Sequence, residues 1–115
     1  MGFLSEIDIL EEFGIEPINV DSNLSLCSYL IKSSNSQVEM EFSFSAVTES
    51  FQVVLRLDRH EIAVLSSENV QAMEVVRDDT GAGIRVLFGF GDSISEARVM
   101  FEPDLFCRWW TLRSY

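Results

Sequence analysis

Few residues of this 115-residue sequence could carry catalysis. His60 is the only histidine, so a Ser-His-Asp or Cys-His nucleophile, or a metal site with paired imidazoles, would depend on it. It lies in the polar stretch Asp58-Arg59-His60-Glu61, which we interpret as a hairpin between two strands. Cys27 and Cys107, the only cysteines, have no metal-ligand spacing, and their apolar neighbourhoods predict buried free thiols. We therefore expect no catalytic and no metal-binding residues.

Short motifs in the second half of the chain predict turns rather than chemistry. Asp79-Thr80-Gly81 resembles the tripeptide of aspartic proteases, but Arg77 and Asp78 precede it where that family has an apolar strand. Gly81-Ala82-Gly83 and Gly89-Phe90-Gly91 lack the third glycine and the strand-to-helix context of a phosphate-binding loop. The sequence therefore indicates a protein that is not an enzyme and that takes no cofactor.

Hydrophobic periodicity predicts one helix and then a series of strands. Phe3, Leu4, Ile7, Leu10 and Phe13 recur at helical spacing, with Ser5 as N-cap and Gly14 at the end. Residues 15–23 contain a proline and turn formers and are typical of a connector. The period then changes to two, which predicts about seven or eight strands, at 26–32, 38–44, 51–57, 62–66, 70–77, 84–90, 97–101 and 106–112.

Short, turn-like separators between these strands favour antiparallel neighbours. We expect a mainly β (α+β) fold with an antiparallel meander curled into a sandwich or open barrel. The N-terminal helix should pack on one side or end of it. The length fits one domain that covers residues 1–115.

The charge is the most unusual property of the sequence. Nineteen acidic residues against eight basic ones give a net charge of −11, and residues 1–50 hold nine acids with Lys32 as their one base. Such a field repels nucleic acid and anionic membranes and speeds encounter with a basic protein, although it also serves solubility alone. The N-terminal segment does not have the composition of a secretion signal, so we expect a cytoplasmic protein without a membrane partner.

Three segments are candidates for a partner-binding surface. Alternation places Glu39 and Glu41, together with three arginines (Arg56, Arg85 and Arg98), on the side opposite the Phe-rich core, where ion pairs could form across strands. If such pairs occupy the two glutamates, the helix and its connector, which lack any basic residue, become the better surface. In Arg108-Trp109-Trp110, the two indoles must point to opposite faces of a strand, which leaves one of them for a contact.

In size, acidity and strand-rich layout the chain resembles the immunity proteins of bacterial contact-dependent inhibition and other polymorphic toxin systems. The resemblance implies an inhibitor that binds one cognate toxin domain in the cytoplasm, and we expect that toxin to be a basic nuclease. The candidate contact residues are Glu11, Glu12, Glu39, Glu41, Trp109 and Trp110. The alternative is a non-catalytic ligand-binding or structural module, with a homodimer left open.

Overall fold

The structure, a computed structural model, describes residues 2–113. These residues form one helix and nine strands. Their bounds are α1 (Glu6–Phe13), β1 (Asn19–Asp21), β2 (Leu26–Lys32), β3 (Val38–Ser45), β4 (Ser50–Leu57), β5 (His60–Ser67), β6 (Val70–Asp78), β7 (Gly81–Phe90), β8 (Ser93–Glu102) and β9 (Phe106–Arg113).

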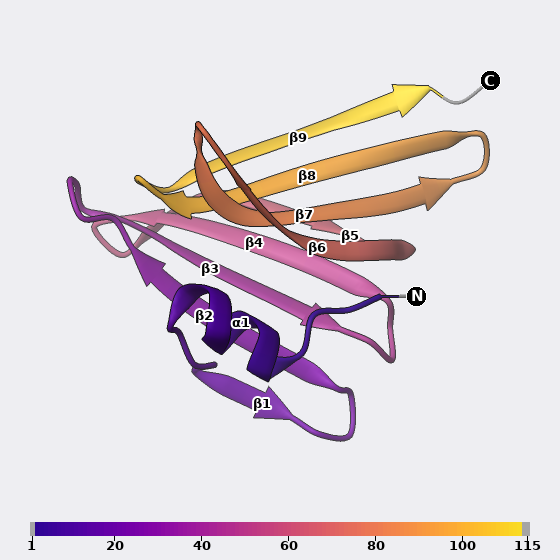
Figure 1. The fold of residues 1–115 in the computed structure, drawn as a ribbon, viewed down its shortest axis with the longest axis horizontal. Helices are drawn as coiled ribbons and strands as arrows, with labels where there is room; N and C mark the ends of the chain where they lie inside the picture. Colours follow the sequence, from indigo (N-terminus) through magenta and orange to yellow (C-terminus); the bar gives the residue numbers. More distant parts are fainter. Residues whose placement is uncertain (1, 114–115) are drawn as a thin grey trace.

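The strands form two antiparallel sheets that pack face to face (Figure 1). The first sheet has the order β1-β2-β3-β4-β5 and the second the order β6-β7-β8-β9, so strands that are consecutive within a sheet are also neighbours. Tight turns make this order the simplest one. The chain changes sheet between β5 and β6, at Glu68 and Asn69. The expected meander and the sandwich are confirmed.

The core is formed by the alternate residues of each strand that point between the sheets. Tyr29, Phe42, Phe51 and Phe88 are completely or almost completely buried. Tyr29 stacks on Phe42 with ring centroids 5.0 Å apart, and Phe42 stacks on Phe101 of the opposite sheet at 5.2 Å. Burial of apolar surface is the dominant favourable contribution to folding, at about 1.5–3 kcal/mol for each fully buried large side chain.

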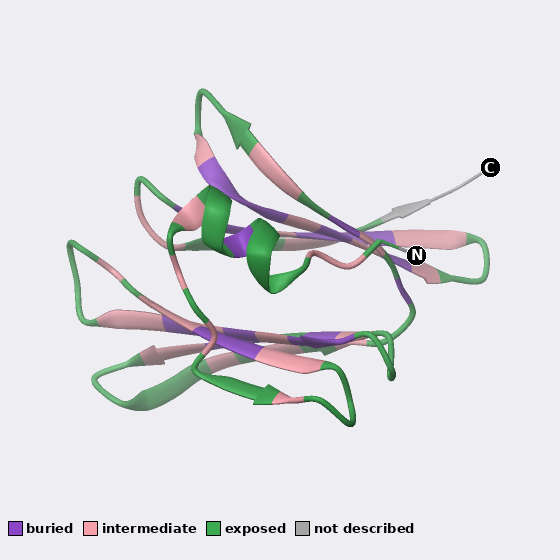
Figure 2. Cartoon of the chain, turned by 60° about the horizontal axis from the view of Figure 1, so that its bottom comes forward, coloured by how far each residue is buried: buried purple, intermediate pink, exposed green. Residues whose placement is uncertain are grey.

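The helix α1 lies in the gap between the two sheets, at one side of the sandwich (Figure 2). The residues before it run along β6, where the Met73 amide donates to the Gly2 carbonyl oxygen at 2.8 Å. Ile9 is fully buried in the core, and Phe13 meets Phe101 edge to face at 4.9 Å. The helix therefore closes the open side of the core next to β6.

The structure differs from the sequence-based expectations in two respects. The connector at 15–23 contains strand β1, which pairs with β2 through Asn19, Val20 and Asp21 and is too short to show a period of two. The charged side that we expected to be continuous is divided between two sheets. Arg56 lies near Glu41 on the first sheet, whereas Arg85 and Arg98 lie on the second, because one alternating pattern cannot tell which sheet a strand joins.

Arg85 and Arg98 belong to a ladder of ion pairs on the outer face of the second sheet. Glu96 is at its centre, with only 5% of its side chain exposed, and accepts hydrogen bonds from Arg85 Nε at 2.9 Å and Arg98 Nε at 3.2 Å. Arg85 also binds Glu74 at 2.6 Å, and Arg98 lies 3.7 Å from Asp78. These contacts raise the pKa of the Arg85 guanidinium, mainly through its hydrogen bonds to Glu74 and Glu96. The ladder therefore pairs both of these arginines with carboxylates.

We predict that Glu96→Gln lowers the free energy of unfolding by about 1–3 kcal/mol, because it removes a buried carboxylate that two arginines share. Urea unfolding monitored by tryptophan fluorescence measures the change. The matched control is Glu74→Gln at the exposed end of the ladder, where we expect a loss below about 1 kcal/mol. Equal losses for the two variants would contradict a central role for Glu96.

Candidate protein-binding surface

The outward side of α1 and the segment that follows it form a surface that is both acidic and apolar. We call it the helix–connector surface and define it as Glu6, Ile7, Leu10, Glu11, Ile15, Glu16, Pro17 and Ile18. Six of these residues line a shallow hollow of about 340 Å³ between the helix and the connector: Glu6, Ile7, Leu10, Ile15, Glu16 and Pro17.

Local hydrogen bonds fix the two ends of the helix. The Asp8 amide donates to the Ser5 hydroxyl at 3.1 Å and the Ser5 amide donates to the Asp8 carboxylate at 2.9 Å, which is a reciprocal capping box. The bond from the Ser5 backbone, followed by that from its side chain, lowers the pKa of Asp8. At the other end Gly14 adopts a left-handed conformation (φ 69°) and its amide donates to the Leu10 carbonyl oxygen.

The phase of the helix exposes residues that the sequence pattern indicates as its apolar face. Because Ile9 and Phe13, four residues apart, point into the core, Ile7 and Leu10 are turned outward and are 66% and 45% exposed. Ile18 in the connector is also exposed, at 57%. Of the apolar residues that recur at helical spacing, Ile7 and Leu10 therefore do not pack on the core, and these exposed aliphatic side chains adjoin the carboxylates.

The carboxylates of this surface and the neighbouring Glu12 differ in whether they have a basic partner. Glu12 is engaged by Arg77, which lies 3.7 Å from its carboxylate and donates to its carbonyl oxygen at 3.1 Å. Within residues 2–113, Glu6, Glu11 and Glu16 form no ion pair. Of the two candidate contact residues on the helix, Glu12 is therefore paired with Arg77. Glu11 has no ion-pair partner within residues 2–113 and can contact a partner protein.

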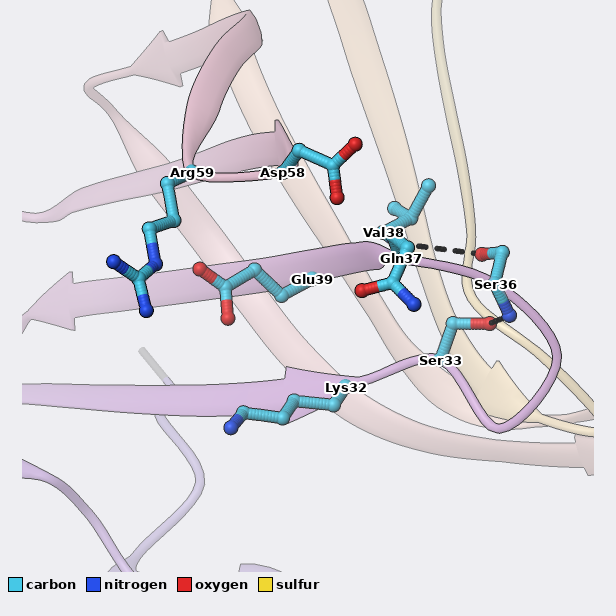
Figure 3. A pocket seen from close by; sticks show the side chains of 8 residues that line it. All are labelled: Lys32, Ser33, Ser36, Gln37, Val38, Glu39, Asp58 and Arg59. Carbon is cyan, nitrogen blue, oxygen red and sulfur yellow. Dashed lines mark hydrogen bonds between the residues drawn. The ribbon is translucent and has the colours of Figure 1, made fainter.

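Glu39 and Glu41 lie on the outer face of the first sheet, among basic side chains. Glu41 forms an ion pair with Arg56 at 3.1 Å. Glu39 lies opposite Lys32 in the β2–β3 register, and both line a hollow of about 440 Å³ that also includes Asp58 and Arg59 (Figure 3). This face is close to neutral, so it gives less attraction for a cation than the helix–connector surface does.

The two tryptophans point to opposite sides of β9, as predicted. Trp109 faces the core and stacks on Phe88 with centroids 5.0 Å apart. Trp110 lies on the outer face opposite Glu96, with the Arg108 guanidinium carbon 4.5 Å from its ring centroid. Trp109 is therefore a packing residue, and Trp110 is the one that a partner could reach. Trp110 lies on β9, and α1 lies beside β6 at the opposite edge of the same sheet. Trp110 is therefore distant from the helix–connector surface.

The remaining chemically reactive side chains form no evident site. Cys27 and Cys107 are free and half-buried, rather than buried as expected. Burial raises the pKa of the Cys107 thiol to about 11. Residues 2–113 contain no cluster of three potential metal ligands, and His60 is exposed at the start of β5. In the same part of the chain, no helix is long and apolar enough to cross a bilayer.

These features define a two-sheet antiparallel sandwich whose open side is closed by a helix that carries an acidic and apolar outer surface. Neither the family models nor the curated proteins give a match to this sequence. Among solved structures, the fold matches a chain of a "Contact-dependent growth inhibition toxin - immunity protein complex from Klebsiella pneumoniae 342". The TM-score is 0.88 with 23% sequence identity, and the alignment covers 96% of each chain. The two chains therefore share one fold.

Tyr29 lies in the core near Glu6 and Cys27, and its hydroxyl group has no hydrogen-bond partner among the described residues. Burial, with smaller contributions from Cys27 and then Glu6, raises its pKa from 10.0 to about 12. The unfolded chain therefore loses this proton first, so the stabilising contribution is complete below pH 10 and is lost between pH 10 and about 12.

We predict that Tyr29→Phe keeps the stability at neutral pH within about 1 kcal/mol of wild type or raises it, because no hydrogen bond is lost. It should also reduce the fall in stability between pH 10 and 12. Urea unfolding at a series of alkaline pH values measures both effects. A large loss of stability at pH 7 would show that the hydroxyl has a partner after all.

Proposed function

We propose that this protein is an immunity protein of a contact-dependent growth inhibition system, which binds one cognate toxin domain and thereby neutralises it. The observation that carries the proposal is the helix–connector surface, where unpaired carboxylates surround exposed aliphatic side chains. The shared fold with a chain of a toxin–immunity protein complex supports it. We propose that this chain is cytoplasmic and binds the toxin domain there.

The charge favours the role of inhibitor over that of toxin. A nuclease must attract phosphate groups and needs basic side chains around its active site. This chain has a net charge of −11, and residues 1–31 contain six acidic residues and no basic one. A protein of this kind repels a nucleic acid substrate and attracts the enzyme that cleaves it, so we propose a basic nuclease as the toxin.

The helix–connector surface has both components of a specific protein contact. Glu6, Glu11 and Glu16 would steer a cationic surface toward the helix, which raises the association rate. Ile7 and Leu10 would then bury their exposed area against the partner, and a few such anchors usually dominate the binding energy. Neither step requires chemistry by this chain, and we propose that it is not an enzyme.

Charge reversal at two sites tests the location of the surface. The variants are Glu11→Lys with Glu16→Lys, and, as a control, Glu39→Lys with Glu41→Lys; each pair changes the net charge by +4, from −11 to −7. With the cognate toxin domain, we expect the first pair to slow association about tenfold and the control pair about twofold or less. Stopped-flow fluorescence at low ionic strength measures both rates.

The biological role is tested by growth. Cells that express the toxin domain should stop growing, and co-expression of the wild-type chain should restore growth. Expression of this chain alone should leave growth unchanged. Leu10→Asp should weaken the toxin complex by at least about 2 kcal/mol, the range of an anchor residue. A chain that neither binds the toxin domain nor restores growth would overturn the proposed function.

A further inference from the structure

The edges of the two sheets differ in how they are protected from pairing with other strands. An edge strand exposes unpaired backbone groups, and proteins normally cover such an edge or place charged residues on it. Three of the four edges in this chain are protected in these ways. Strand β1 has three residues and ends in Asp21, β6 is paired with Gly2 and lies beside α1, and β9 contains Arg108.

Strand β5 is the least protected edge over its last positions, because its one acid, Glu61, and a β-bulge at Ile62 both lie near its start. It has eight residues, pairs only with β4, and no charged residue occurs in its last six positions, 62–67. Ile62 and Val64 are 56% and 51% exposed, which is high for β-branched side chains in a strand. A long, uncharged edge of this kind favours the addition of another strand.

The outer face next to Val64 is uncharged, unlike the helix–connector surface. On β4, the neighbours of β5 on that side include Gln52 opposite Ser66, the nearly buried Val54 opposite Val64, and Arg56, which pairs with Glu41 and lies opposite Glu61. Two copies of a chain with a net charge of −11 repel each other at most orientations, and they can approach most closely where the surface is uncharged.

We propose that β5 is a self-association edge, where two copies of this chain pair their β5 strands antiparallel around a two-fold axis near Val64. The pairing would satisfy the exposed backbone groups of both edges and join two five-stranded sheets into one continuous sheet. It would bury Ile62 and Val64 of each copy without bringing like charges opposite each other. This inference is independent of the proposed toxin binding, because α1 lies between β6 and the first strands of the other sheet, away from β5.

The dependence on salt separates the two interactions. Self-association brings together two chains of the same charge, so salt screens a repulsion and should strengthen the dimer. Binding of a basic toxin should instead weaken as salt rises. The two proposals can therefore fail separately in the same set of experiments.

Sedimentation equilibrium of the wild-type chain from about 1 µM to about 1 mM tests the dimer. We expect a mass that rises from 13.1 kDa toward twice that value, and at lower concentrations when salt is added. Val64→Lys should weaken the association at least about tenfold, since it places two like charges at the axis. The matched control is Val47→Lys, an exposed residue of the β3–β4 turn, which should leave the association unchanged.

Hydrogen exchange provides a second measurement that does not need a variant. In concentrated samples the β5 amides that face away from β4 should be protected, and the protection should disappear on dilution. A wild-type chain that remains a monomer at every concentration and salt level would overturn the proposal. So would a dimer that Val64→Lys and Val47→Lys weaken equally, or a monomer whose β5 edge is protected only by the toxin domain.

Discussion

Two sheets that pack face to face leave their apolar core open along the sides, and closure of one such side determines much of this structure. Next to β6, the core residues Tyr29 and Phe101 would meet water if nothing covered them. The helix α1 supplies Ile9 and Phe13 to close that side. Because a helix has 3.6 residues per turn, this orientation turns Ile7, Leu10 and Glu11 away from the core. The packing of the core thus fixes which residues a partner protein can meet.

Charges that form ion pairs and charges that do not lie on different surfaces of the molecule. On the outer face of the second sheet, the ladder around Glu96 pairs arginines with carboxylates, and on the first sheet Arg56 pairs with Glu41. The first 31 residues have no base of their own, and only Glu12 is engaged by a basic residue from elsewhere in the described chain. The surplus negative charge is therefore concentrated beside the helix and the connector, where it can act on the approach of a cationic partner.

The sequence predicts the strands of this fold well because each core strand alternates large apolar residues with polar ones, as in Met40, Phe42 and Phe44 of β3. It also predicts that Trp109 and Trp110 separate, since this follows from the geometry of one strand. It cannot predict how the strands divide into two sheets, and this division places Glu41 and Arg85 on different faces. It also does not predict the three-residue strand β1. The sequence also does not predict which side of α1 faces the core. More than one apolar face is possible with Ile7, Ile9, Leu10 and Phe13, and only tertiary packing selects among them.

We propose that a toxin domain binds the helix–connector surface. Amide hydrogen exchange of the full chain, with and without the cognate toxin domain, maps the contact most directly because it reports every segment in one experiment. We expect new protection concentrated in residues 6–21, with the exchange of β7 and β8 unchanged. Protection confined to the outer face of either sheet, with α1 and the connector exchanging as in the free chain, would contradict it.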